Sequence, residues 1–412
     1  MNVYLIGVGI SLIVYIVVGN YVGTRVKTLD DYYVMGRNAP TVLIVGTLVA
    51  SFLSTNAFMG DTGYAYSGYA MLLLILIFIN AVGYVIGAMY FGRYIRRAKP
   101  LTVPHYFGER FKSKKVQMAA GITTVVGVTG YLLSVTQGTS LLMSEITGLP
   151  YQSVLLACWI VYTSFCFYSG SGGVVITDTI MFFVFVAAAI VATPSILQAA
   201  GGWFPGLEQL ANFDLKPGIL SYHGMVGANA DFAAPRDAIA WAVTMGVVWA
   251  LVVASSPWQV GRFLMAKSEH VVIRSAIIAP LCAIFMCGMT YFVAPYINLV
   301  NPDIVPNERN YIWAAMNLMP TFWGVLLLTG IMAAGLSSAS TFLSLIGFSM
   351  TNDVLQIKNN DEKKMLRISR ITMICCGLVA LVIAYFQPPA MLYITFFAAT
   401  IFASSWGPIA FM

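Results

Sequence analysis

The stretch that decides the fold is residues 275–302, SAIIAPLCAIFMCGMTYFVAPYINLVNP, which contains no Asp, Glu, Lys or Arg. Further charge-free runs occupy 69–92, 116–144 and 238–261. Each run is long enough to cross the hydrocarbon core of a bilayer as a helix, which takes about 20 residues. None of them alternates apolar and polar residues as the strands of a membrane barrel would. The sequence therefore predicts an all-α membrane protein.

The composition of the whole chain agrees with this prediction. Of its 412 residues, 59% are hydrophobic and only 9% are charged, whereas a water-soluble domain carries about 25% charged residues. The apolar runs predict about eleven transmembrane helices, which begin near Val3, Thr41, Tyr69, Val116, Tyr151, Val174, Ala238, Val272, Phe322, Arg370 and Ala390. The last run ends without a closing basic cluster, so we expect the chain to be truncated at its C-terminus.

Basic residues gather on one side of the predicted bilayer. The loops after the first, third, seventh and ninth spans hold 19 of the 22 Lys and Arg residues, Arg262 among them. Basic loops face the cytoplasm, which places the N-terminus outside and the protein in the cell membrane. The net charge of +6 therefore reflects topology, and we expect contact with the lipid bilayer and no nucleic-acid partner.

Two of the predicted spans are interrupted by polar residues. The second contains Ala50-Ser51-Phe52-Leu53-Ser54-Thr55-Asn56, and the seventh contains Ala254-Ser255-Ser256-Pro257-Trp258-Gln259. Pro257 removes a helical hydrogen bond. Paired breaks predict an inverted five-helix repeat with two discontinuous helices and a binding site at mid-membrane. Its halves are 40–197 and 238–412 of a single transmembrane domain, 1–412, with one extra N-terminal helix and a partly helical cap at 198–237.

The ninth span is unusually rich in hydroxyl groups. Ser337, Thr341 and Ser344 share one helical face, and Ser338 is adjacent. Small hydroxyl residues often serve only to pack helices in membranes. The alternative is a cation site, because hard cations prefer oxygen ligands. Carbonyls released near Ala50 and Leu53 would add to the hydroxyls, and we favour the cation site for that reason.

Three carboxylates lie in or at the ends of spans, where a charge is costly and usually functional. Asp178, near the start of the sixth span, is suited to attract a cation that leaves toward the cytoplasm. Its alternative is an interfacial carboxylate at a helix start. Asp61 and Glu145 are expected near the outer face with a structural role.

A further group of polar and aromatic residues could line a solute cavity, although each could equally serve packing or the membrane interface. They are Ser54, Asn56, Phe58, Asn80, Tyr131, Gln137, Trp249, Ser256, Trp258 and Gln259. No histidine lies within a span, and no Cys/His cluster or Gly-rich phosphate loop occurs. The sequence therefore predicts neither an enzyme nor an ATP-driven pump.

Six motifs, in the same order, resemble the sodium:solute symporter family. They are Asp31–Arg37, Ala50–Ser54, Thr102–Pro104 with Glu109–Phe111, Tyr168–Asp178, Gly261–Ser268 and Ala334–Ser338. The resemblance implies sodium-coupled symport of a small organic solute by alternating access, with Na+ as the coupling ion. Met181 departs from the glutamine usual in the family.

The resemblance also assigns residues. It implies a sodium site formed by the carbonyls of Ala50, Leu53 and Ala334 and the hydroxyls of Ser337 and Ser338. Asp178 would match a carboxylate near the sodium exit path. Ser256 and Trp258 would match a substrate-binding and a gating residue.

The substrate is less defined. The wholly apolar stretch Leu74–Ile79 stands where sugar transporters of the family carry an acidic ligand, which favours an organic acid or an amino acid. Two other functions stay open. A proton-coupled transporter of the same architecture would use Asp178 or Asp61 to carry the proton, and a sensor or other non-transporting module of the family would not transport at all.

Overall fold

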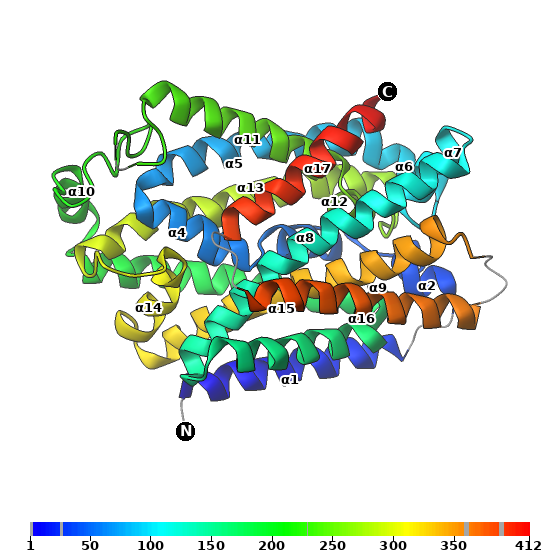
Figure 1. Ribbon diagram of the computed structural model, residues 1–412, viewed down its shortest axis with the longest axis horizontal. Coiled ribbons are helices and arrows are strands. Elements are labelled where there is room, and N and C mark those ends of the chain that lie inside the picture. Colours follow the sequence, from blue (N-terminus) through cyan, green and yellow to red (C-terminus); the bar gives the residue numbers. More distant parts are fainter. Residues whose placement is uncertain (1–2, 25–27, 229, 358–361, 387–390) are drawn as a thin grey trace.

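The computed structural model (Figure 1) describes residues 3–24, 28–228, 230–357, 362–386 and 391–412. Within these ranges nine helical segments are long and apolar enough to cross a membrane. They belong to α1 (Val3–Gly23), α5 (Ala70–Gly87), α8 (Lys114–Thr147), α9 (Tyr151–Ala199), α11 (Pro235–Ser255), α13 (Glu269–Val293), α15 (Thr321–Phe348), α16 (Glu362–Tyr385) and α17 (Met391–Phe411). No β-strand occurs in the described part, which confirms the predicted all-α fold.

The fifth and sixth predicted spans both fall in α9. Its 49 residues would extend about 74 Å if straight, more than twice the hydrocarbon core. Near its start, Tyr151 donates a hydrogen bond to the Ala384 carbonyl in the last turn of α16. Near its middle, Ser171 accepts one from the Met35 amide at the end of α2 (Leu29–Val34), at the opposite end of the bundle (Figure 1).

The predicted start of the eleventh span, Ala390, lies outside the described residues.

The first predicted break lies where α3 (Thr41–Phe52) ends. Leu53 leaves the helical region, with φ −78° and ψ 80°. The Ser54 amide donates to the Phe52 carbonyl (3.0 Å) rather than to Ala50, and the Ala57 amide donates to Ser54 (3.1 Å) rather than to Leu53. The carbonyls of Ala50 and Leu53 therefore lose their usual partners four residues ahead.

Wide helical turns continue the span beyond this break. They are η2 (Asn56–Asp61), α4 (Thr62–Tyr64) and η3 (Ala65–Tyr69), and α5 follows at once. The second predicted break separates α11 from α12 (Pro257–Phe263) at Ser256, which is extended (φ −65°, ψ 150°). An extended residue is favoured before proline, and Pro257 occupies the first position of the new helix, where its missing amide is harmless. Both discontinuous helices are thus confirmed.

The segment 198–237, predicted as a cap, is partly helical, as expected. It contains α10 (Trp203–Ala211), followed by turns that reach α11. Lys216 of this cap donates from Nζ to the Asn298 side chain (2.6 Å) and to the Tyr66 carbonyl (3.2 Å). Burial lowers the pKa of Lys216 to about 8, against the opposing effect of Asp303. The Lys216 side chain therefore connects the cap to two residues outside it, Asn298 and Tyr66.

Close packing of α5 against α11 holds the second break in place. A Cβ atom at Gly83 would lie 2.1 Å from the Ala250 carbonyl oxygen, and one at Gly87 would lie 2.5 Å from the Ala254 Cα. Two small residues four positions apart are a common means of bringing membrane helices together. Here they set the end of α11 directly beside α5.

This packing predicts that Gly83→Ala destabilises the protein, although alanine is the better helix former. The new methyl group meets backbone, and such overpacking costs about 1–3 kcal/mol. The matched control is Gly288→Ala on α13, where a Cβ meets nothing within 4 Å. Thermal melting of the purified proteins should show a loss only for Gly83→Ala, and equal melting of both variants would contradict this packing.

Candidate functional site

Asp178 lies where four helices meet. Its carboxylate is fully buried on α9 and accepts hydrogen bonds from Thr47 of α3 (2.6 Å) and Ser337 of α15 (2.6 Å). The Arg262 guanidinium of α12 forms an ion pair with it at 3.3 Å. Arg262 also donates to the Thr341 hydroxyl of α15. One buried ion pair and three hydroxyl groups therefore connect both broken helices to α9 and α15.

Two expectations about these charges are wrong. Arg262 was assigned to a cytoplasmic loop, but it is only 5% exposed because α12 continues the broken span inside the protein. The alternative interpretation of Asp178, an interfacial carboxylate at a helix start, fails because its side chain is completely buried within α9.

The predicted ion ligands lie near this junction. Ala50, Leu53 and Ala334 are buried, and Ser337 already contacts Asp178. The Ser338 hydroxyl is buried and has no hydrogen-bond partner among the described residues. Helix α15 meets the first break directly, because a Cβ at Gly335 would lie 2.9 Å from the Thr55 methyl group. Two released carbonyls and two serine hydroxyls thus occur where α3 breaks beside α15.

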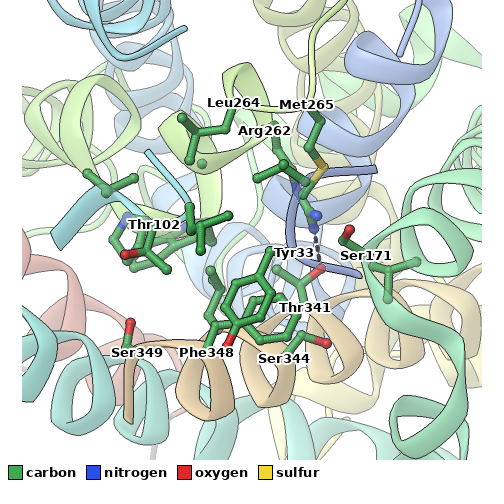
Figure 2. A pocket seen from close by; sticks show the side chains of 18 of the residues that line it. Tyr33, Thr102, Ser171, Arg262, Leu264, Met265, Thr341, Ser344, Phe348 and Ser349 are labelled. Atoms are coloured by element: carbon green, nitrogen blue, oxygen red, sulfur yellow. Dashed lines mark hydrogen bonds between the residues drawn. The ribbon is translucent and has the colours of Figure 1, made fainter. Parts of the chain in front are cut away.

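A cavity of about 550 Å³ opens on the other side of Arg262 (Figure 2). Figure 2 shows the Arg262 side chain in its wall, with the guanidinium directed at Thr341. The lining comes mainly from α2, α12, α15 and α7 (Val103–Arg110). Its polar members are Tyr33, Thr102, Ser171, Arg262, Thr341, Ser344 and Ser349. Because its walls include the ends of elements that adjoin the basic loops, we refer to it as the inner cavity.

A second, small cavity lies beside the first break. We refer to it as the central cavity. Of the residues predicted to line a solute site, Ser54, Asn56, Tyr131 and Trp249 border it. Its remaining lining residues are Phe52, Ala57, Asp61, Leu73, Leu76, Ile77, Tyr291 and Phe396. The Ser54 and Tyr131 hydroxyls lie 3.4 Å apart across it.

Asp61, expected near the outer face with a structural role, borders the central cavity. Its carboxylate accepts hydrogen bonds from Tyr291 (2.6 Å) and Asn56 (3.1 Å). Glu145, by contrast, forms an ion pair with Arg309 outside both cavities, as a structural residue would.

The other predicted solute residues lie elsewhere. Trp258 lines the inner cavity and packs edge-on against Tyr131, Phe342 and Phe402. Gln259 lies between the Tyr84 hydroxyl (3.2 Å) and the Leu48 carbonyl (3.4 Å). Phe58, Asn80, Gln137 and Ser256 are buried without bordering the central cavity. The structure thus gathers only part of the predicted set around one space.

The buried ion pair predicts a strong asymmetry between single and double variants. Arg262→Met leaves the Asp178 carboxylate buried without its cation and should cost about 3–5 kcal/mol of stability. The double variant Arg262→Met/Asp178→Asn removes both charges and should recover most of that loss. Arg97→Met, which breaks an exposed pair with Glu269, is the control and should leave the melting temperature nearly unchanged. Additive losses in a thermal double-mutant cycle would contradict direct pairing.

Comparisons with known proteins agree with the sequence motifs. The profile of the sodium:solute symporter family matches residues 32–412. The sodium/pantothenate symporter of Escherichia coli K12 is 25% identical over 88% of this chain and 74% of its own. The sodium/proline symporter of Salmonella typhimurium LT2 is 23% identical over 96% of this chain and 79% of its own.

Solved structures share the fold. A Na+-coupled sialic acid symporter, in a substrate-bound outward-open state, superposes with a TM-score of 0.80 at 18% identity, over 93% of this chain and 82% of its own. MhsT in complex with L-phenylalanine superposes with a TM-score of 0.55 at 13% identity, over 89% of this chain and 87% of its own. Because the family profile covers nearly the whole sequence, this chain belongs to the sodium:solute symporter family.

Proposed function

We propose that this protein is a secondary active symporter that couples the uptake of a small organic solute to sodium. The observation that carries the proposal is the first helix break, where the carbonyls of Ala50 and Leu53 leave the helical pattern beside the hydroxyls of α15. Discontinuous helices supply ion ligands in this way in many transporters. Membership of the family, and the names of its relatives, support sodium as the ion.

In this proposal sodium binds the carbonyls of Ala50, Leu53 and Ala334 and the hydroxyls of Ser337 and Ser338. Oxygen is the ligand atom that a hard cation prefers. A hydroxyl group has one proton to donate and two lone pairs. Ser337 donates its proton to Asp178, so its lone pairs stay available to a cation. Ser338, with no partner in the described part of the chain, would gain one.

Asp178 is proposed as the residue that attracts sodium on its way to the inner side. It is one hydrogen bond from Ser337 and one ion pair from Arg262, which borders the inner cavity. A cation at Ser337 would repel the guanidinium, since little dielectric screening exists in so buried a place. Sodium and Arg262 would therefore compete for the same carboxylate.

The remaining parts of the proposal concern topology. Residues 40–197 and 238–412 would form the two inverted repeats whose relative movement gives alternating access. The cell membrane would hold the protein with its N-terminus outside, because the basic loops favour the cytoplasm.

The proposal predicts sodium-selective thermal stabilisation of the purified protein. A ligand that binds only the folded state at ~100 times its Kd adds ~2.7 kcal/mol. Sodium should therefore raise the melting temperature above that in potassium or choline chloride at equal ionic strength. Ser338→Ala should lose this sodium-specific rise.

The matched control is Ser344→Ala, because Ser344 lies on the same helix but borders the inner cavity instead. It should keep the full response to sodium. A proton-coupled transporter would respond to pH and show no preference for sodium, and that result would overturn the proposal.

A further inference from the structure

One charged side chain, the Asp61 carboxylate, lines the central cavity. Its negative charge limits the chemical class of solute that can bind there. Asp61 is the sole Asp, Glu, Lys, Arg or His among the described residues that line this space. Its two hydrogen-bond donors, the Tyr291 hydroxyl and the Asn56 amide, are both neutral. Asp178, in contrast, has the Arg262 cation beside it. A carboxylate inside a membrane-spanning segment usually has a partner charge or marks a functional site, and the described residues that line this cavity include no cation.

Two of the cations expected on the outer side already have partners. Lys216 bonds to Asn298 and the Tyr66 carbonyl, and Arg309 pairs with Glu145. Neither borders the central cavity. The complementary positive charge is therefore expected to come from whatever enters this space.

A second polar atom indicates the same chemistry. Asn56 is 4% exposed and borders the cavity, and its Nδ2 donates to Asp61. Its Oδ1 is buried with no hydrogen-bond partner in the described part of the chain. This oxygen can only accept a hydrogen bond. A ligand whose positively charged group carries N–H donors would therefore complete both Asn56 and Asp61.

Aromatic rings form much of the remaining wall. Trp249 packs edge-on against Phe52 (6.0 Å between ring centroids), Tyr131 (6.3 Å) and Phe396 (6.3 Å). Ring faces attract cations and also bury apolar parts of a ligand. The lining thus suits a small molecule with an ammonium group and an apolar body.

A neighbouring cavity is also lined by negatively charged residues. A cavity of about 770 Å³ borders Gly60 and Gly63, on either side of Asp61 in the sequence. Asp231 and Glu308 are the charged residues in its lining, and no Lys, Arg or His occurs among those described there. Carboxylates along an entrance raise the local concentration of cations.

We propose that the transported solute carries an ammonium group, which binds the Asp61 carboxylate and the Asn56 Oδ1 atom in the central cavity. The proposal rests on the proposed symport function and specifies its substrate class. Amines and amino acids fit this description. Organic acids without an amino group do not, because the cavity offers them a carboxylate and no cation.

The test is a thermal-shift screen of the full purified chain in saturating sodium chloride. A broad panel of small metabolites should include matched triples with one apolar body, such as L-leucine, isoamylamine and 4-methylpentanoate, or L-proline, pyrrolidine and cyclopentanecarboxylate. Compounds that stabilise the protein should all carry an ammonium group. Their apparent affinity should fall about 30-fold or more in Asp61→Asn, as expected when one partner of a buried charge pair is removed.

Two controls separate this proposal from the symport function. Asp237→Asn makes the same chemical change at an exposed position outside the cavity and should leave solute affinity unchanged. Asp61→Asn should keep the sodium-specific shift measured without solute. If wild type lacks that sodium shift, the symport function itself fails.

With the sodium shift intact, three results would overturn the ammonium proposal. They are stabilisation by compounds without an ammonium group, an ammonium compound whose affinity is unchanged in Asp61→Asn, and a panel in which no ammonium compound binds. Loss of the sodium shift in Asp61→Asn would also overturn it, because Asp61 would then be an ion ligand.

Discussion

A backbone carbonyl that loses its helical partner inside a bilayer has no water to replace it. The first break creates two such carbonyls, at Ala50 and Leu53, in a fully buried place. Such a break is tolerated only where protein surrounds it or where it lines a cavity. Here α15 provides the cover through Gly335, whose missing side chain admits Thr55. Ser337 and Ser338 follow Gly335 on the same helix, so the break and the proposed ion site would depend on one packing arrangement.

Asp178 and Asp61, which both lie on membrane-spanning segments, differ in their partners, and this difference divides the proposed functions. Asp178 has a cation from the protein itself, Arg262, and a hydroxyl shared with the proposed ion site. Asp61 has neutral donors only and faces a cavity with aromatic walls. Asp178, whose charge the protein already balances, is suited to the proposed ion path. Asp61, whose charge has no protein cation beside it, is suited to bind the positively charged group of the proposed solute. Ser54 and Asn56, which border the central cavity, directly follow Leu53, whose carbonyl is a proposed ion ligand. Such closeness would allow the proposed ion site and the proposed solute site to be coupled.

Much of the fold could be predicted from the sequence, because the bilayer restricts the possibilities so strongly. Charge-free runs gave the helices, Pro257 marked the second break, and the polar cluster around Ser54 marked the first. How deeply an individual residue is buried was harder to predict. Arg262 was counted with the basic loop, since a residue just after a predicted span normally lies in water. Helix α12 (Pro257–Phe263) continues past the break and keeps Arg262 buried. Nothing local in the sequence indicates how far this helix extends.

The site could be predicted only in part for a similar reason. Asp61 follows a break in which wide helical turns replace regular ones. The regular helical period of 3.6 residues therefore does not predict which side of the helix its side chain occupies. Its partner Tyr291 is 230 positions away in the sequence, and contact over such a separation has no local signal. A carboxylate inside an apolar run did indicate function, and that signal applied to Asp61 as well as to Asp178.

The most direct test of the central claim is equilibrium binding of radioactive ²²Na+ to the purified protein. The account predicts saturable binding that unlabelled sodium displaces and potassium does not. The double variant Ser337→Ala/Ser338→Ala should bind far more weakly, while Ser344→Ala should bind like wild type. Saturable binding that persists unchanged in the double variant would show that sodium does not bind where α3 breaks beside α15, and would contradict the account.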